Sequence, residues 1–451
     1  MRVAVASRFG NGLSWWRRLA DEGADVRVWI DPPSQKSVGD GLIEKAGAYE
    51  TLLSWAKEGV LSGEPTLMLF DSISLGQRAD AARRWGLPVV GGGAFMDRLE
   101  KDRAFGARIA AEAGTRIPPC EEFASIHDAL SRCESAPLGP AYFKSDRYID
   151  GDATHGAHDG EEMAQYLRDL IEQHGGHGRC VLQTRIEGVP FSTGRWWNGL
   201  AWVGPYEATY ENKRLMNDDV GPSTGCALNA IWFYPDEDPY MAQALGWEGL
   251  TLPFRRAHAP PGLYDLNAIV DAQGDAWFLE FTSRLGYDSE PTSQRLIPNL
   301  SAHLFAVANG AQIEAPYDDL AYAVRLSIPP YPWEYGERSD EGSADGHRIG
   351  GADGIWDGNF IAYDVRMRDE ALVSAGPEGI VGLTLAVGER LSDLHAEAMA
   401  FAKSLSVAGL MYRTDGDRDC AQAAKRLAEA GVEVHPGLLA QPRKQKTEEV
   451  A

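Results

Sequence analysis

The sequence predicts an α/β protein with several domains, and three observations lead to that prediction. Strand-like and helix-like segments alternate through residues 1–96. Aromatic strands broken by Gly-containing turns follow, and the last third again mixes strands with helices. The chain has 451 residues, of which 44% are hydrophobic, so it can fill roughly three domains of ordinary size.

The N-terminal region is expected to form a Rossmann-like domain over residues 1–96. Strands that alternate with helices imply a parallel sheet with crossover helices. The turn after the first strand, residues 7–12, lacks the GxGxxG pattern of dinucleotide sites, so we do not expect nicotinamide or flavin binding. The expected strands are 2–6, 26–30, 66–70 and 87–90, and the expected helices are 13–22 and 76–85.

A second domain is expected at 97–310, with a lid subdomain at about 115–190. Its final two strands flank residues 271–275, a sequence typical of a hairpin turn. The expected helices are 98–113 and 161–173. The expected strands are 141–144, 180–185, a pair within 196–210, 266–270 and 276–281, and the expected loops run from 145 to about 158 and from 218 to 225.

A C-terminal domain is expected at 311–440, with strands at 321–328 and 381–387 and a helix at 394–404. Residues 336–354 are rich in Gly, Ser, Asp and Glu, which predicts a mobile surface loop. Residues 441–451 are charged and without apolar periodicity, which predicts a disordered tail.

Composition narrows the class of function. The formal net charge of −23 argues against nucleic acid as a partner, although a local group of Arg and Lys can still attract a small anion. The five cysteines contain no CxxC pair, which suits a reducing compartment. No segment approaches the roughly 18 apolar residues of a membrane span. We expect a cytoplasmic monomer or homodimer that acts on small molecules.

Several polar segments fit the needs of ATP-dependent carboxylate activation. That chemistry needs cations along the triphosphate, a covering loop and hard oxygen ligands for Mg²⁺. Each candidate has a plainer interpretation: Lys144 could be a surface lysine, 221–225 an ordinary turn, and Glu280 a structural partner of Arg284. The candidates in chain order are Arg103, Lys144, loop 146–156, Lys213, Arg214, Asp219, loop 221–225, Glu280 and Arg284.

Taken together, the order and spacing resemble phosphoribosylamine–glycine ligase, an ATP-grasp enzyme of purine synthesis, over almost the whole chain. The resemblance implies an ATP-grasp fold, preceded by the Rossmann-like domain and followed by a small mixed α+β domain. The matching segments are 99–105 (LEGSKAF in the family), 142–146 (IKADG), 181–188 (VIEEFLDG), 212–225 (HKR…DTGPNTGG), 279–286 (IEFNCRFG) and 411–416 (FCRKDIG).

The resemblance also implies an ATP-dependent carboxylate–amine ligase that forms an amide through an acyl phosphate, using ATP and Mg²⁺ (or Mn²⁺). Its partners would be a small carboxylate and a small amine. The implied site residues are Arg103, Lys144, Gly151, Gln183, Arg185 and Ile186 for the nucleotide, Glu280 and Thr282 for the metal, Arg284 and Lys213 for catalysis, and Lys213, Arg214, Asp219, Ser223, Thr224, Gly225 and Arg284 for the substrates.

Departures from the family pattern lead us to expect an altered substrate. Thr282 stands where the family has a metal-binding Asn, and Asp152 replaces a lysine of the phosphate loop. Residues 8–12 and 70–75 replace the loops that cradle a ribose phosphate, and Asp71 would repel a phosphate. Two alternatives stay open: a genuine but divergent phosphoribosylamine–glycine ligase, and a non-catalytic descendant that binds a ligand or partner through the old cleft.

Two other patterns have competing interpretations. Residues 174–180 contain two His and one Cys at a spacing that could bind zinc, but a Gly-rich turn fits as well and no fourth ligand is evident. The aromatic residues Trp196, Trp197 and Trp202 are expected to pack a sheet, with adenine stacking as the alternative.

Overall fold

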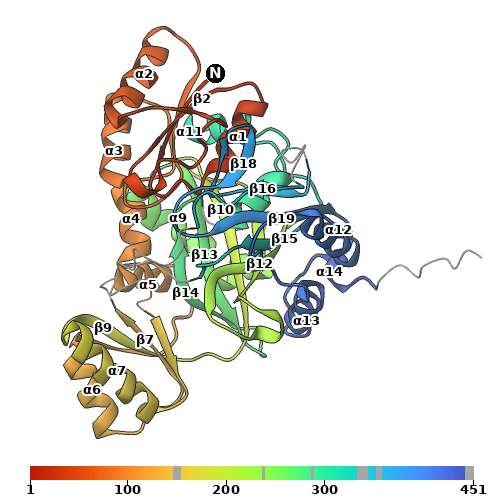
Figure 1. The fold of residues 1–451 in the computed structure, drawn as a ribbon. Helices are drawn as coiled ribbons and strands as arrows, with labels where there is room; N and C mark the ends of the chain where they lie inside the picture. Colours follow the sequence, from red (N-terminus) through yellow and green to blue (C-terminus); the bar gives the residue numbers. More distant parts are fainter. Residues whose placement is uncertain (146–153, 236–238, 286–288, 333–343, 352–357, 442–451) are drawn as a thin grey trace, which may run out of the picture.

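The computed structural model describes residues 1–145, 154–235, 239–285, 289–332, 344–351 and 358–441. It contains a five-stranded, an eight-stranded, a four-stranded and a two-stranded sheet (Figure 1). Gly151 and the tail from residue 442 lie outside the described residues, as does most of loop 336–354. Within the described ranges, no helix combines the length and apolar character that crossing a bilayer would require.

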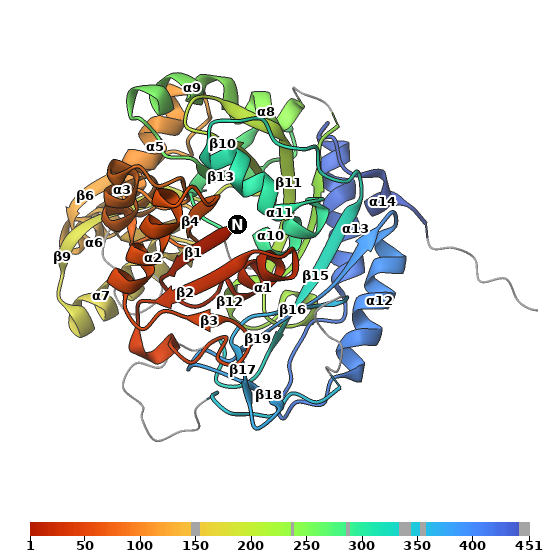
Figure 2. The same ribbon diagram turned by 90° about the horizontal axis from the view of Figure 1, so that it is seen from above.

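The N-terminal sheet is parallel, with strand order β3-β2-β1-β4-β5, which confirms the Rossmann-like arrangement (Figures 1 and 2). All five residues of β4 are buried, as expected for a strand covered on both faces. The sequence pattern did not predict α2. The elements are β1 (Arg2–Ser7), α1 (Leu13–Asp21), β2 (Asp25–Ile30), β3 (Glu44–Lys45), α2 (Tyr49–Leu61), β4 (Thr66–Phe70), α3 (Gly76–Trp85) and β5 (Val89–Val90).

The single helix expected at 98–113 is wrong, because the chain breaks at Asp102 into α4 (Ala94–Lys101) and α5 (Arg103–Glu112). Asp102 has non-helical backbone angles, φ −90° and ψ 87°, and its side chain accepts a hydrogen bond from Phe105 N. This cap starts a new helix one residue later. The break therefore puts Arg103 in the first turn of α5.

The four-stranded sheet and two helices form a unit with a hydrophobic cluster of its own (Figure 1, lower left). Its strand order is β6-β9-β7-β8. The loop expected up to residue 158 is partly wrong, because residues 154–157 pair with β7 as a strand. The elements are β6 (Cys120–Ser125), α6 (Ile126–Ser135), β7 (Ala141–Ser145), β8 (Thr154–Ala157), α7 (Gly160–His174) and β9 (His177–Thr184).

The eight-stranded sheet forms the centre of the molecule, with order β14-β13-β10-β11-β12-β15-β19-β16. Strands from both sides of residue 310 belong to it, since β12 pairs with β15. The loop expected at 218–225 ends early, because Ser223 already begins β12. The strands are β10 (Val189–Trp197), β11 (Trp202–Arg214), β12 (Ser223–Phe233), β13 (Gly262–Val270), β14 (Ala276–Thr282), β15 (Leu320–Ser327), β16 (Phe360–Ala362) and β19 (Ile380–Gly388).

One face of the central sheet is apolar and packs against helices, as Tyr206, Ala208 and Tyr210 of β11 do in the largest hydrophobic cluster. Trp247 and Phe254 of α9 lie in the same cluster. The remaining elements are η1 (Pro33–Gln35), η2 (Asn217–Asp219), α8 (Tyr240–Ala244), α9 (Trp247–Arg256), α10 (Ser289–Ser293), η3 (Gln294–Leu296), α11 (Leu300–Ala308), β17 (Val365–Arg368), β18 (Ala371–Ser374), α12 (Leu391–Ser404), α13 (Gly416–Glu429) and α14 (Pro436–Leu439).

Candidate active site

The opposite face of the central sheet is polar over four neighbouring strands. Side chains alternate between faces along a strand, so the residues on either side of Tyr206, Ala208 and Tyr210 point away from the apolar core. Strand register places these polar residues in two rows across the sheet. The polar sheet face consists of Glu207, Gly194, Asp265 and Thr282 in one row, Thr209, Ser192, Asn267 and Glu280 in the next, and Glu211 further along β11.

Three cations from separate elements surround Glu280 at one end of the polar sheet face. Arg103 at the start of α5 forms an ion pair with the Glu280 carboxylate. Lys144 of β7 and Lys213 of β11 interact electrostatically with the same carboxylate. We refer to Arg103, Lys144 and Lys213 as the cationic group. The fold therefore brings together four residues that are up to 177 positions apart in the chain.

The charges of the cationic group control the protonation of its members. Burial alone would raise the pKa of Glu280, but Arg103, Lys213 and Lys144 outweigh it and lower that pKa to about 2. Burial, helped by repulsion from Arg103, lowers the pKa of Lys144 to about 8. Desolvation also works to lower the pKa of Lys213, but the carboxylates of Glu280 and Glu211 raise it above its usual value.

A β-bulge orients Glu280. The register between β13 and β14 shifts at Leu279, so that Asn267 faces Glu280 while the next residue, Ala268, faces Phe278. The extra residue lets Phe278 and Phe281 both enter the apolar core, with ring centroids 5.2 Å apart. Glu280 is consequently left on the polar face, with a side chain that is 29% exposed.

Arg284 is not the partner of Glu280, so the plainer interpretation of that pair is wrong. Its Nε atom lies 2.9 Å from Glu100 Oε1, and the other oxygen of Glu100 accepts a hydrogen bond of 3.0 Å from Ser283 N. Glu100, in α4, thereby fixes the chain just after β14. The sequence pattern did not assign this role to Glu100, because its partners lie 183 and 184 residues away in the chain.

The predicted nucleotide residues beyond the cationic group lie at and just after the end of β9. Gln183 is buried and faces Tyr142 of β7, two residues from Lys144. Arg185 N donates a hydrogen bond of 2.9 Å to Pro140 O, and its guanidinium lies 3.4 Å from Glu187. Ile186 follows and is half-buried. Lys144 and Gln183 therefore belong to the same small sheet, next to the connection to β10.

The residues predicted to bind substrate lie together where β11 turns into β12. Arg214 faces Ser223 in the strand register, and its guanidinium donates to Gly221 O at 2.7 Å. Thr224 Oγ1 donates to Lys213 O at 2.8 Å, with Gly225 next in β12. This hairpin end adjoins the cationic group through Lys213.

Asp219 belongs to an ion network that joins this hairpin to α13. Its Oδ1 atom accepts hydrogen bonds from Asn212 Nδ2 at 2.7 Å and Arg413 Nη1 at 2.9 Å. The Arg413 side chain is 0% exposed and also pairs with Asp415 and Asp419. Arg413 thus ties the turn between β11 and β12 to the C-terminal segment, an assignment that needed the tertiary contacts.

The donor atoms around Glu280 fit a magnesium ion that arrives with phosphate. Thr282 Oγ1 and Asp265 Oδ2 accept hydrogen bonds from Asn267 Nδ2 at 3.0 and 2.9 Å. Mg²⁺ usually takes one or two carboxylates and completes its shell with water and phosphate oxygens. In the part of the chain that the structure describes, no three His, Cys, Asp or Glu side chains form a metal-holding group. Glu280 and Thr282 suit that incomplete shell.

A buried carboxyl group lies where β1 and β4 of the N-terminal sheet end. Asp71 Oδ2 accepts a hydrogen bond from Trp16 Nε1 at 3.1 Å, and Oδ1 accepts one from Ser72 Oγ at 2.8 Å. A Cβ atom on Gly12 would lie only 2.2 Å from Asp71 Oδ2. Burial raises the pKa of Asp71 to about 6. The ends of these two strands are therefore tightly packed around an acidic group.

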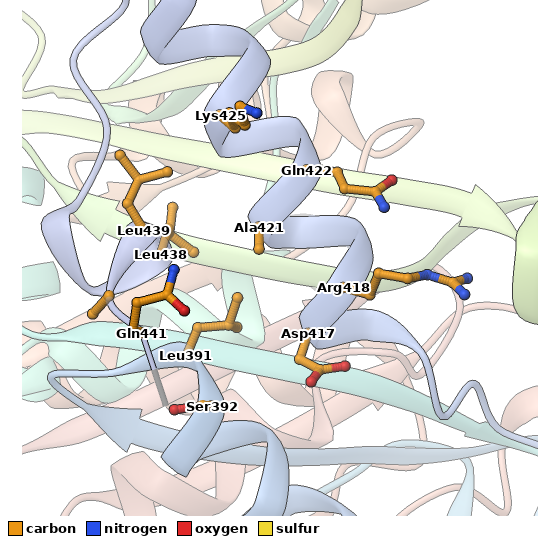
Figure 3. Close-up of a pocket in the computed structure, with 11 residues that line it drawn as sticks. Leu391, Ser392, Asp417, Arg418, Ala421, Gln422, Lys425, Leu438, Leu439 and Gln441 are labelled. Carbon is orange, nitrogen blue, oxygen red and sulfur yellow. The ribbon is translucent and has the colours of Figure 1, made fainter. Parts of the chain in front are cut away.

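A hollow of about 410 Å³ beside α13 contains none of the predicted site residues (Figure 3). It is lined by residues such as Leu391, Gln422 and Lys425. The tryptophans are also structural: Trp197 is 0% exposed and donates to Ala259 O, and its ring lies 4.9 Å from that of Trp202. Sheet packing is confirmed for this pair.

Comparisons with known proteins agree with this geometry. No protein-family model matches the chain. The phosphoribosylamine–glycine ligase of Leifsonia xyli subsp. xyli is 27% identical over 354 residues, covering 75% of this chain and 80% of the relative. The Pseudomonas putida enzyme of the same name is 22% identical over 439 residues, covering 92% of this chain and 96% of the relative.

Solved structures show the same fold. The crystal structure of phosphoribosylamine–glycine ligase from Thermotoga maritima aligns with a TM-score of 0.70 at 20% identity, over 92% of this chain and 100% of that one. The biotin carboxylase–β-γ-ATP complex from Campylobacter jejuni aligns with a TM-score of 0.59 at 13% identity, over 91% and 92%. The chain therefore has the ATP-grasp fold of these enzymes. In sequence it is similar, at low identity, to phosphoribosylamine–glycine ligases.

Proposed function

We propose that the chain is an ATP-dependent carboxylate–amine ligase whose nucleotide and metal site is the cationic group around Glu280. One observation carries this proposal: three cations converge on a single ionised carboxylate at the edge of the polar sheet face. The site combines a net positive charge with one hard oxygen ligand. A triphosphate that carries Mg²⁺ supplies the negative charge that balances these cations. Its oxygens also supply metal ligands that the site itself lacks.

Each residue has a defined task in the proposed reaction. Arg103 and Lys144 neutralise phosphate oxygens. Glu280 and Thr282 hold the metal ion, which offsets the charge that builds up as the γ-phosphoryl group moves. Arg284, held by Glu100, stabilises the acyl-phosphate oxygens when the amine attacks. Lys213 lies between the acceptor site and the nucleotide site. The acceptor site is shaped by Arg214, Asp219, Ser223, Thr224 and Gly225. The nucleotide site also includes Gly151, Gln183, Arg185 and Ile186.

We further propose that the substrate differs from phosphoribosylamine. The packing at the ends of β1 and β4 supports an altered substrate. A ribose phosphate would need amide donors and space there, but Asp71 and Trp16 pack against each other at that place. Placing a phosphate next to a buried carboxyl would cost electrostatic energy. Freshly generated phosphoribosylamine with glycine and MgATP is the direct test. Efficient turnover would show that the chain is a phosphoribosylamine–glycine ligase and would refute the proposal of an altered substrate.

The wider proposal is tested by an ADP-release screen over small carboxylates and amines, together with calorimetry of MgATP binding. We expect MgATP to bind with a Kd in the micromolar range and at least one substrate pair to release ADP. An absence of MgATP binding would overturn the ligase assignment and favour a non-catalytic descendant. Lys425→Gln is a suitable control, because the Lys425 side chain is 73% exposed and its ion partner is Glu429 in the same helix, α13.

A further inference from the structure

The other end of the polar sheet face carries a second group of charges that the proposed chemistry does not use. Glu207 and Asp265 lie on either side of Gly194 in one row of the sheet, and Glu211 follows Glu207 on the same face of β11. We refer to Glu207, Glu211 and Asp265 as the acidic cluster. Glu207 and Asp265 are 3% and 8% exposed, so their charges lie within the protein.

A fourth carboxylate approaches the acidic cluster from a different element. Glu290 of α10 is 2% exposed, and its Oε2 atom has no hydrogen-bond partner. α10 packs against β11 and β12, and the strongest electrostatic neighbours of Glu290 are Glu207, Asp265 and Glu211, so its carboxyl lies close to the cluster. Asn229, directly across from Glu211 in the strand register, is fully buried and also has an unpartnered acceptor, Oδ1.

These unpartnered atoms identify the chemistry of what would bind there. Asn229 Oδ1 is an acceptor, and Glu290 Oε2 becomes one when its carboxyl ionises, so a cationic ligand that favours the ionised form can donate hydrogen bonds to both. Several carboxylates brought together also require positive charge. Among the described residues no three of these groups lie close enough to hold a metal ion. An organic cation, whose N–H donors point in several directions, matches this dispersed arrangement better than a small ion does.

Gly194 leaves the strip of sheet between Glu207 and Asp265 without a side chain. A Cβ atom there would lie 3.6 Å from Glu207 Cβ and 3.7 Å from Asp265 Oδ1. Those are ordinary contact distances, so a side chain larger than a methyl group at Gly194 would press against both residues. The same face leads to Thr282 and the partly exposed Glu280, where the reaction is proposed to occur.

We propose that the acidic cluster and Glu290 bind a cationic nitrogen of the acceptor substrate, so that the acceptor is an amine with a second, non-reacting ammonium or guanidinium group. This rests on the proposed ligase function. Glu207 and Glu211 share strand β11 with Lys213, which adjoins the cationic group. One strand thus carries an acidic end for the substrate and a basic end for the nucleotide, separated by a few residues. The charged anchor fixes the second amine beside the acyl phosphate.

The test measures binding of diaminobutane by calorimetry, with butylamine and butanediol as probes of equal chain length and lower charge. We expect diaminobutane to bind, butylamine to bind at least tenfold more weakly, and butanediol not to bind. Glu290→Gln and Glu207→Gln should each weaken diaminobutane binding at least tenfold. Gly194→Val should weaken it similarly without changing any charge, because its side chain would press against both Glu207 and Asp265.

Asp364→Asn is the matched control, since Asp364 is another buried carboxyl with an unpartnered oxygen but belongs to neither group. Binding of MgATP, measured on every variant, reports folding and tests the ligase proposal separately. The cation-site proposal is overturned if the wild type does not bind diaminobutane, or if all variants bind it equally well. So would saturable binding of Mg²⁺ alone that Glu290→Gln removes. Loss of MgATP binding in the wild type would instead overturn the ligase function.

Discussion

The two ends of the polar sheet face hold the same kind of side chain in opposite states. Within the cationic group, Glu280 has a pKa lowered to about 2 by three nearby cations. In the acidic cluster, burial and neighbouring carboxylates hold the pKa values of Asp265 and Glu290 well above their usual range, and burial does the same for Glu207. On the polar sheet face, placement among other charges, and not residue type, therefore decides what a carboxyl can do.

The difference also suggests a division of labour. An ionised carboxylate among cations suits a metal–phosphate complex, because it adds an oxygen ligand where phosphates are attracted. Carboxyls that outnumber the cations around them suit a ligand that brings its own positive charge. Arg284 lies between the two ends, paired with Glu100 and close enough to Glu290 to influence its charge.

The largest effect is expected when the ionised end is neutralised. Glu280→Gln should lower kcat for ADP release by about 10²–10³-fold, because charge stabilisation in the transition state is lost. Circular dichroism should show an intact fold. The same substitution at the surface, Glu187→Gln, changes a carboxylate that is 85% exposed and should leave kcat unaltered. Wild-type kcat in Glu280→Gln would refute the metal assignment.

The next effect concerns the stability of the acidic end. Folded Glu207 keeps its proton to a higher pH than the unfolded chain does, so its contribution to stability is lost as pH rises from about 5 to 8. Glu207→Gln has no carboxyl to ionise at this position, so it does not lose this stability. At pH 8 its free energy of unfolding should exceed that of the wild type by on the order of 2 kcal/mol.

Thermal melts of Glu207→Gln and the wild type across this pH range provide the measurement. Glu280→Gln is the informative contrast. The Glu280 carboxylate is stabilised above its unfolded pKa, so its contribution is lost only as pH falls towards about 2. Parallel pH profiles for wild type and Glu207→Gln would mean that the Glu207 carboxyl is not perturbed by burial.

A smaller effect is expected from Lys144. Its pKa of about 8 means that it is charged below that pH and neutral above it. Affinity for ATP should therefore weaken as pH rises through 8, by up to about tenfold per pH unit. Lys144→Arg keeps its charge and should remove this pH dependence. A wild-type affinity that is flat from pH 7 to 9 would contradict contact between Lys144 and phosphate.

The smallest expected signal is that of Mg²⁺ without nucleotide. Glu280 supplies one negative charge amid three positive ones, so a free divalent ion is repelled from this end of the sheet. Calorimetry with MgCl₂ alone should give no heat that Glu280→Gln alters, while MgATP should bind. Tight binding of Mg²⁺ alone at Glu280 would show that the cationic group is less positive than the contacts indicate.

Sequence patterns predicted much of this arrangement. The parallel N-terminal sheet, strand β14 and helix α7 agree closely with the expected limits, because their apolar periodicity is local. Strand β13 ends where expected but begins four residues earlier, at Gly262 instead of Leu266. Arg103, Lys144, Lys213 and Glu280 were all candidates. The acidic cluster was not, although Glu207, Thr209, Glu211 and Lys213 alternate with apolar residues along β11 in the period of a strand. That alternation was a usable signal.

Other features were beyond sequence reasoning. The break at Asp102 depends on a cap that competes with a continuous helical pattern. The partner of Arg284 is Glu100, which lies 184 residues away. The Arg413 network links α13 to the β11–β12 hairpin over 194 residues. Pairs of this kind form only when separate elements dock, so no local pattern encodes them.

By itself, the sequence determined the order of strands and helices, the resemblance to phosphoribosylamine–glycine ligase, and the identity of the cations and the carboxylate at the proposed nucleotide site. Only the tertiary structure decided which carboxyls are ionised and which retain protons, because that depends on burial and on charges from distant segments. Glu280 and Glu207 are the same residue type on one sheet face. Three cations reach Glu280 and fix its charge, whereas Glu207 is buried among other acids.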